Sequence, residues 1–126
     1  MSHTAFRVVP VDVDVTVSAD GTVTIKCTPE SAPVVKDTKH ALIAFKLNTP
    51  GYRFRDTDAI TLDNGSGGDN FPYPSWTLGD TEAALYDNNK TKQPFPYTVT
   101  VVNTTTGQEY SVDPIIDNGG GGISLC

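Results

Sequence analysis

The chain has little cysteine, little positive charge and no long apolar run. Its 126 residues contain two cysteines, Cys27 and Cys126, too few for a disulfide framework or a multi-cysteine metal site. Nine Lys and Arg residues stand against fifteen Asp and Glu residues, which gives a formal charge of −6 without any basic cluster. Nucleic acid and anionic membranes are therefore poor partners on electrostatic grounds. No apolar segment approaches the length of a membrane span.

Signals for secretion and for catalysis are also missing. The first residues carry no basic segment followed by a continuous apolar one, so we expect the chain to stay in the cytoplasm. No Gly-x-Ser-x-Gly elbow and no phosphate-cradling glycine loop occurs. Carboxylate pairs arise by chance in a chain with fifteen acidic residues. The sequence therefore predicts a protein that is not an enzyme and has no obligatory cofactor.

What the sequence does have is strict alternation of apolar and polar residues, the pattern of half-buried strands. Residues 11–18 alternate, and residues 22–27 alternate again after the loop Ala19–Gly21. A three-residue loop would pair Val17 with Val23 and keep the apolar side chains of both strands on one face. A two-residue turn would instead set apolar residues opposite polar ones. The longer loop is therefore the predicted one.

A second hairpin is predicted near the C-terminus. The four-residue loop Thr104–Gly107, with its glycine in the left-handed conformation, would set Val101 opposite Tyr110. Asp113 and Pro114 follow the second strand. Because proline has no N–H to donate to a ladder, this dipeptide predicts the end of the strand.

The other strand signals are shorter. The continuous apolar segment 41–47 favours a central strand, although a short buried helix has the same pattern. Segments 52–55, 59–62 and 75–78 each predict a brief strand. Residues 80–86 are compatible with a helical turn or with a strand.

These elements predict an all-β protein. About seven to nine short strands with regular turn signals favour an immunoglobulin-like antiparallel β-sandwich, with a small β-barrel as the alternative. Residues 1–118 are expected to form a single domain, followed by a Gly-rich C-terminal tail over 119–126.

Acidic residues suggest a calcium site. Asp63 and Asp69 flank a polar loop, and Asp56 and Asp58 lie just upstream. Calcium prefers such oxygen ligands. A solvated turn built from Asp, Asn and Gly accounts for the same residues without any metal.

Aromatic residues gather around the same loop and suggest a second kind of site. Tyr52, Tyr73, Trp76 and Tyr86 offer flat apolar rings with polar tips, which can stack on sugar rings. Packing in the core and at corners of the domain accounts for the same residues. Both interpretations remain open from the sequence.

The C-terminal element SVDPIIDNG, preceded by YTVTVVNTTTGQEY, resembles the small bacterial proteins of the DP-EP family, which is named for Asp-Pro and Glu-Pro dipeptides. Asp113 and Pro114 match the first dipeptide, and Asp117-Asn118-Gly119 stands where the second is expected. A weaker similarity is to inclusion-body proteins of the AidA/PixA type. The resemblance implies a bacterial β-sandwich and brings no catalytic residues.

These features predict a protein that works by self-association or by binding another protein. An exposed edge strand near Val34–Val35 or Ile115–Ile116 would supply the hydrogen-bonding groups. The alternative is a carbohydrate- or calcium-binding module that uses residues 56–76.

Overall fold

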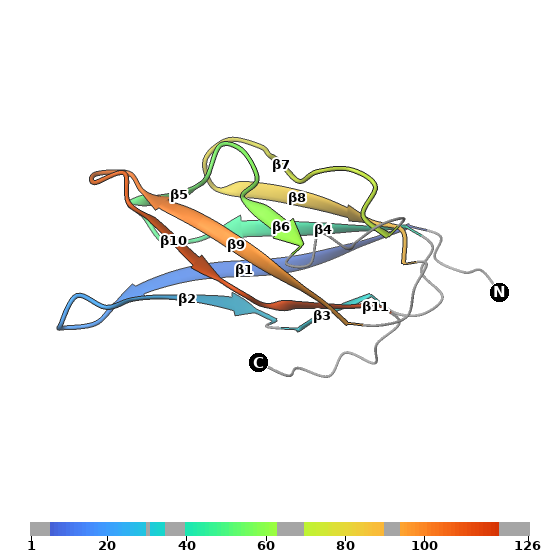
Figure 1. The fold of residues 1–126 in the computed structure, drawn as a ribbon, viewed down its shortest axis with the longest axis horizontal. Coiled ribbons are helices and arrows are strands. Elements are labelled where there is room, and N and C mark those ends of the chain that lie inside the picture. Colours follow the sequence, from blue (N-terminus) through green and yellow to red (C-terminus); the bar gives the residue numbers. More distant parts are fainter. Residues whose placement is uncertain (1–5, 30, 35–39, 63–69, 90–93, 119–126) are drawn as a thin grey trace.

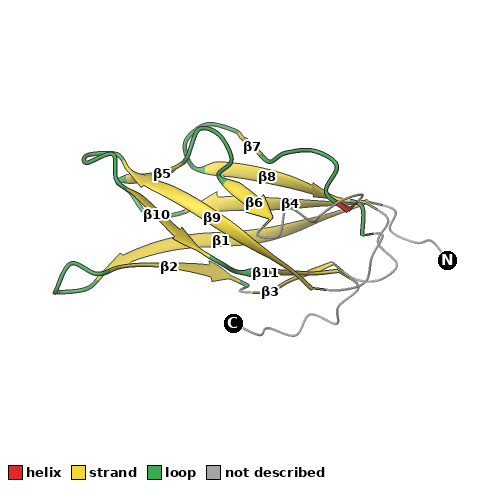
Figure 2. Ribbon diagram, in the orientation of Figure 1, coloured by secondary structure: helices red, strands yellow, loops and turns green. Residues whose placement is uncertain are grey.

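The computed structural model describes residues 6–29, 31–34, 40–62, 70–89 and 94–118. The described chain is all-β, and Figure 2 shows strands and connecting loops along almost its whole length. It forms eleven strands, which are β1 (Phe6–Val17), β2 (Val23–Thr28), β3 (Ser31–Val34), β4 (His40–Leu47), β5 (Tyr52–Phe54), β6 (Ile60–Leu62), β7 (Trp76–Thr77), β8 (Glu82–Asp87), β9 (Pro94–Asn103), β10 (Glu109–Val112) and β11 (Ile115–Asn118).

The strands form two sheets. The first has the order β2-β1-β4-β8-β7, and the second has the order β10-β9-β11-β3, with β5 and β6 also paired to β9 (Figure 1). Alternate residues of both sheets point into one shared hydrophobic core, which includes Val13 and Ile43 from the first sheet and Val99 and Ile116 from the second. The predicted β-sandwich is therefore confirmed. The predicted tail, residues 119–126, lies outside the described residues.

Two pairings are parallel, although the sequence predicted antiparallel sheets. β1 pairs with β4, and β3 pairs with β11. Parallel neighbours need a long crossover connection. Here β2 follows β1 and pairs with it as a hairpin, and the chain then crosses to the other sheet, where it forms β3. It comes back to the first sheet as β4, which runs beside β1 in the same direction.

The number and position of the short strands also differ from the prediction. The eleven strands exceed the expected seven to nine because several segments of only two to four residues find a partner strand. The prediction of an edge strand at Ile115–Ile116 is wrong, since β11 lies between β9 and β3. β3 is an edge strand, and it contains Val34; Val35 lies outside the described residues. Residues 82–87 form a strand rather than a helical turn.

Both hairpins have the predicted registers. Val17 pairs with Val23, and Val101 pairs with Tyr110. Gly21 and Gly107 have φ angles of 89° and 76°, the left-handed conformation that each loop requires.

The turn of the first hairpin is fixed by its side chains. The carboxylate of Asp20 accepts hydrogen bonds from the Ser18 hydroxyl and from the backbone N–H of Thr22. These bonds, the one from Ser18 first, lower the pKa of Asp20 from 3.8 to about 2. At any pH well above about 2, the Asp20 carboxylate therefore stays ionised and the turn keeps these hydrogen bonds.

The centre of the core contains a buried hydroxyl, that of Tyr97, with no partner in the described part of the chain. Tyr97 is fully buried, and its ring packs edge-on against Phe45 with 5.7 Å between the ring centroids. Among the described residues its hydroxyl makes no hydrogen bond. Burial, followed by the nearby Cys27, raises the pKa of Tyr97 well above its ordinary value of 10.0.

Replacing Tyr97 by phenylalanine is expected to raise the free energy of unfolding by about 1 kcal/mol, because a buried unpaired hydroxyl costs desolvation energy that a ring hydrogen does not. Urea denaturation measures the change. The raised pKa also means that the unfolded chain ionises first, so part of the wild-type stability is lost as the pH rises above 10.0. Because Tyr97→Phe has no hydroxyl to ionise at this position, its free energy of unfolding should fall less than that of the wild type above pH 10.0. Tyr52→Phe, at a half-buried position, is the control, and a Tyr97→Phe variant less stable than wild type would contradict the prediction.

Candidate functional site

The outer face of the first sheet is apolar at one end. On β1, β4 and β8 every second residue points away from the core, and the strand register aligns these residues in rows. Val8, Leu42 and Tyr86 form one row. A second row continues onto β7 through the pairing of Ala84 with Trp76. We call this surface the apolar face, and its members are Val8, Pro10, Leu42, Ala44, Trp76, Leu78, Ala84 and Tyr86.

Exposed apolar side chains concentrate at this face. In the described part of the chain, the large apolar residues that remain exposed are Val8 (51%), Trp76 (41%), Leu78 (59%), Tyr73 (60%) and Val17 (55%). The first three belong to the apolar face, and Tyr73 packs against its border. Val17 lies at the opposite end of β1. An isolated exposed apolar residue is ordinary, whereas a contiguous group marks an interaction surface.

The apolar face has a hollow along one side. Ala44 and Ala84 are small and lie side by side on neighbouring strands, so the surface is recessed between Pro10, Leu42 and Leu78. Asp12, Lys46 and Glu82 complete the lining of the hollow. The hollow has a volume of about 310 Å³. A concave apolar surface of this kind accepts a projecting apolar side chain.

A charged row bounds the apolar face on one side. Asp12 on β1, Lys46 on β4 and Glu82 on β8 are cross-strand partners, so acidic, basic and acidic groups alternate across the sheet. Asn48 also donates a hydrogen bond to Asp12 at 3.2 Å. The face thus has an apolar centre and a polar border, the arrangement typical of protein interfaces.

The outer face of the second sheet is built differently. Arg53 pairs with Asp56 at 3.0 Å, and Arg55 pairs with Glu109 at 3.2 Å. Charged side chains therefore cover part of this outer face, as is usual for a sheet that faces water.

Three of the four predicted aromatic residues lie on the apolar face or at its border. The rings of Tyr73 and Tyr86 lie 5.7 Å apart, and His40 stacks on Tyr86 at 5.9 Å and hydrogen-bonds its hydroxyl. Trp76 points to the same side of the sheet, opposite Ala84.

The fourth predicted aromatic residue lies elsewhere. Tyr52 belongs to β5 in the second sheet, where its ring packs against Tyr110 at 6.4 Å. The prediction of a single cluster is therefore wrong for Tyr52, because β5 pairs with β9 rather than with the strands of the first sheet.

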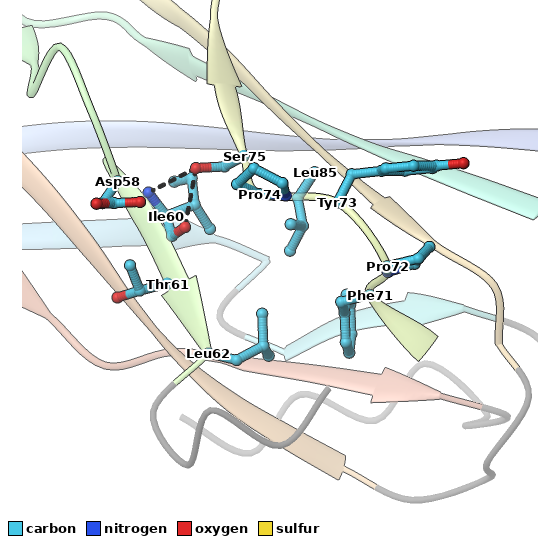
Figure 3. Close-up of a pocket in the computed structure, with 10 residues that line it drawn as sticks. All are labelled: Asp58, Ile60, Thr61, Leu62, Phe71, Pro72, Tyr73, Pro74, Ser75 and Leu85. Atoms are coloured by element: carbon cyan, nitrogen blue, oxygen red, sulfur yellow. Dashed lines mark hydrogen bonds between the residues drawn. The ribbon is translucent and has the colours of Figure 1, made fainter. Parts of the chain in front are cut away.

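A second cavity, of about 240 Å³, lies between β6 and the segment that carries Tyr73. Leu62, Phe71 and Leu85 converge on it, while the ring of Tyr73 points away (Figure 3). The Ser75 hydroxyl accepts a hydrogen bond from the backbone N–H of Ile60 at 3.3 Å and donates one to the Ile60 carbonyl at 2.9 Å. This pair of bonds fixes the segment to β6.

The acidic residues predicted to bind calcium do not form a site in the described part of the chain. Asp56 is paired with Arg53, and the backbone carbonyl of Asp58 accepts a hydrogen bond from Arg55 at 2.8 Å. Asp63 and Asp69 lie outside the described residues. Within the described ranges, no group of three His, Cys, Asp or Glu side chains is arranged to hold a metal ion.

Asp113 and Pro114 separate two strands, as the sequence predicted. β10 ends at Val112 and β11 begins at Ile115. The Asp113 carboxylate accepts a hydrogen bond from the Thr98 hydroxyl at 2.7 Å. The Pro114 carbonyl accepts one from the Tyr97 N–H at 3.0 Å. β10 and β11 both pair with β9 in one continuous antiparallel register, so the dipeptide interrupts the strand without changing its direction.

No model of a known protein family and no curated protein matches this chain. The resemblance to the DP-EP family stays a prediction. In the described segments no helix has both the length and the hydrophobicity that crossing a membrane requires.

The sequence interpretation missed most of the apolar face. One signal was available, because β4 is apolar without alternation over residues 41–45. Such a run is typical of strands that are covered on both faces. The described second sheet covers only the inner face of β4, which leaves Leu42 and Ala44 on the outer side.

Proposed function

We propose that the protein is a non-enzymatic binding module that associates with a protein surface through the apolar face. The observation that supports this is the grouping of Val8, Trp76 and Leu78 on one end of one sheet, with the Tyr73 ring at its border. Contact between water and these apolar side chains raises the free energy of the unbound protein, and association removes that contact. The charged row beside it supplies a polar rim.

The mode of binding differs from the one that the sequence suggested. Addition of a strand requires an accessible edge. Ile115 and Ile116 are internal to their sheet, and the edge strand β3 offers only four residues. We therefore assign the association to the apolar face of the first sheet.

Site-specific photo-crosslinking tests this proposal. A benzophenone side chain placed at position 78 lies within the proposed interface, and the same group at position 17 is equally exposed outside it. In extracts of the cells that produce the protein, we expect position 78, and not position 17, to crosslink to a defined polypeptide, either a second copy or another protein. Equal crosslinking at both positions, or none at position 78, would contradict the proposal.

Carbohydrate binding is a second candidate, favoured by one observation. Tyr73 offers an exposed ring packed on Tyr86, and aromatic rings presented in this way can stack on sugars. Trp76 is the only tryptophan, so its fluorescence reports on this surface alone. Saturable quenching by an oligosaccharide, absent in Tyr73→Ala, would support this function. Unchanged Trp76 fluorescence across a panel of glycans would contradict carbohydrate binding at this surface.

A further inference from the structure

The shape of the apolar face indicates what binds there. We propose that its occupant is a second copy of this chain, and that the two copies stack their apolar faces in a two-fold symmetric dimer. This inference rests on the proposed function, since it names the partner of the same surface.

The first reason is that the face contains both a projection and a recess. Leu78 and Val8 project, while the hollow of about 310 Å³ lies over Ala44 and Ala84 beside Leu78. In a two-fold interface the same patch is used by both subunits, so every projection must meet a recess of the same face. A face that carries both can satisfy this requirement with its own copy.

The second reason is the size of the face. Strands about 4.8 Å apart and rows about 6.8 Å apart give four strands and three rows, the charged row of Asp12, Lys46 and Glu82 included, an area of roughly 20 by 20 Å, or about 400 Å². Two copies would therefore bury about 800 Å², roughly half of the ~1,600 Å² of a standard interface. An area of this size fits a weak dimer that forms only at high concentration.

The third reason is the charge of the border. The row Asp12, Lys46 and Glu82 alternates in sign and sums to a charge of only −1, so the border itself neither selects a strongly basic partner nor strongly repels a second copy. The chain as a whole carries −6, and two copies repel each other at long range. The association must therefore come from apolar contact, and salt should strengthen it by screening the repulsion.

The test is sedimentation equilibrium of the full chain at concentrations up to about 1 mM, where even weak dimers form. Val8→Glu and Val17→Glu are a matched pair, because they make the same change in the same strand at similar exposure. We expect the wild type and Val17→Glu to dimerise alike. Val8→Glu places an unpaired carboxylate in the interface of each copy and should weaken the dimer by about 100-fold or more. Leu78→Glu should do the same.

Added salt should tighten the wild-type dimer, and equal melting temperatures of Val8→Glu and Val17→Glu, measured at a concentration where both are monomeric, would show that folding is unaffected. A wild type that stays monomeric at the highest concentration overturns the inference, as does a dimer that both glutamate variants weaken equally. A monomer that still crosslinks from position 78 to a different polypeptide contradicts the second copy and leaves the proposed function standing. A monomer without such a crosslink contradicts both.

Discussion

Replacing Phe45 by alanine is expected to lower the free energy of unfolding by about 3–5 kcal/mol, the usual loss for a large aromatic ring removed from a core. Phe45 lies near the middle of the first sheet on β4, is 1% exposed and packs against the Tyr97 ring of the second sheet. The deletion removes contacts between the two sheets and leaves a cavity that β-strands on both sides cannot close. Urea denaturation, with the transition midpoint and slope both measured, gives the change.

Leu42→Ala is the matched control, because Leu42 lies in the same strand but faces outward. In a monomer its loss should cost less than about 1 kcal/mol. Both variants are best compared in the Val8→Glu background, so that dimer formation does not contribute to stability. Equal losses for Phe45→Ala and Leu42→Ala would mean that both faces of β4 are covered, contrary to the structure.

Replacing Ser75 by alanine is expected to lower the free energy of unfolding by about 2 kcal/mol, since it leaves both backbone groups of Ile60 without their partner. Ile60 is 2% exposed, so water does not readily replace the Ser75 hydroxyl. The segment that carries Tyr73 should also loosen from β6. Hydrogen exchange of the Ile60 N–H should accelerate along with the loss of stability.

Thr104→Val is the control for this change. The Thr104 hydroxyl also donates to a backbone carbonyl, that of Gly51 at 3.1 Å, but in an exposed position. Its removal should change stability by less than about 0.5 kcal/mol, because water replaces the lost partner. If Ser75→Ala proved as mild as Thr104→Val, the Ser75 bonds would not be what fixes the segment.

The parts of the fold that could be predicted from the sequence are local. The register between Val17 and Val23 follows from the alternation of the two segments and the length of the loop between them. The same holds for Val101 and Tyr110. Each prediction uses only residues that are close in the chain, so no knowledge of distant strands is needed.

The parts that failed depend on distant segments. Whether Ile115–Ile116 forms an edge is decided by where β3 lies, and β3 is far away in the sequence. The parallel pairing of β1 with β4 likewise depends on the route of the chain between them. Periodicity carries no information about either, because it reports which side of a strand is buried and not which strand is its neighbour.

The candidate site was partly predictable for the same reason. Tyr73, Trp76 and Tyr86 are close in sequence. Tyr73 packs against Tyr86, and Trp76 lies on β7, which pairs with β8. Tyr52 could not be excluded from the group without the pairing of β5 with β9. The apolar face combines residues from four strands, and only the register across the sheet brings Val8 beside Leu42.

The pairing of β9 has a consequence for how the protein is made. β9 pairs with β5, β6, β10 and β11, so most of the second sheet is assembled on this one strand. A ribosome releases β1, β2, β4 and β8 before β9. The growing chain can therefore pair the strands of the first sheet while their inner, strongly apolar side still lacks its cover. During that interval the nascent chain exposes both sides of β4 to the cell, and completion of β9 ends the exposure of one of them.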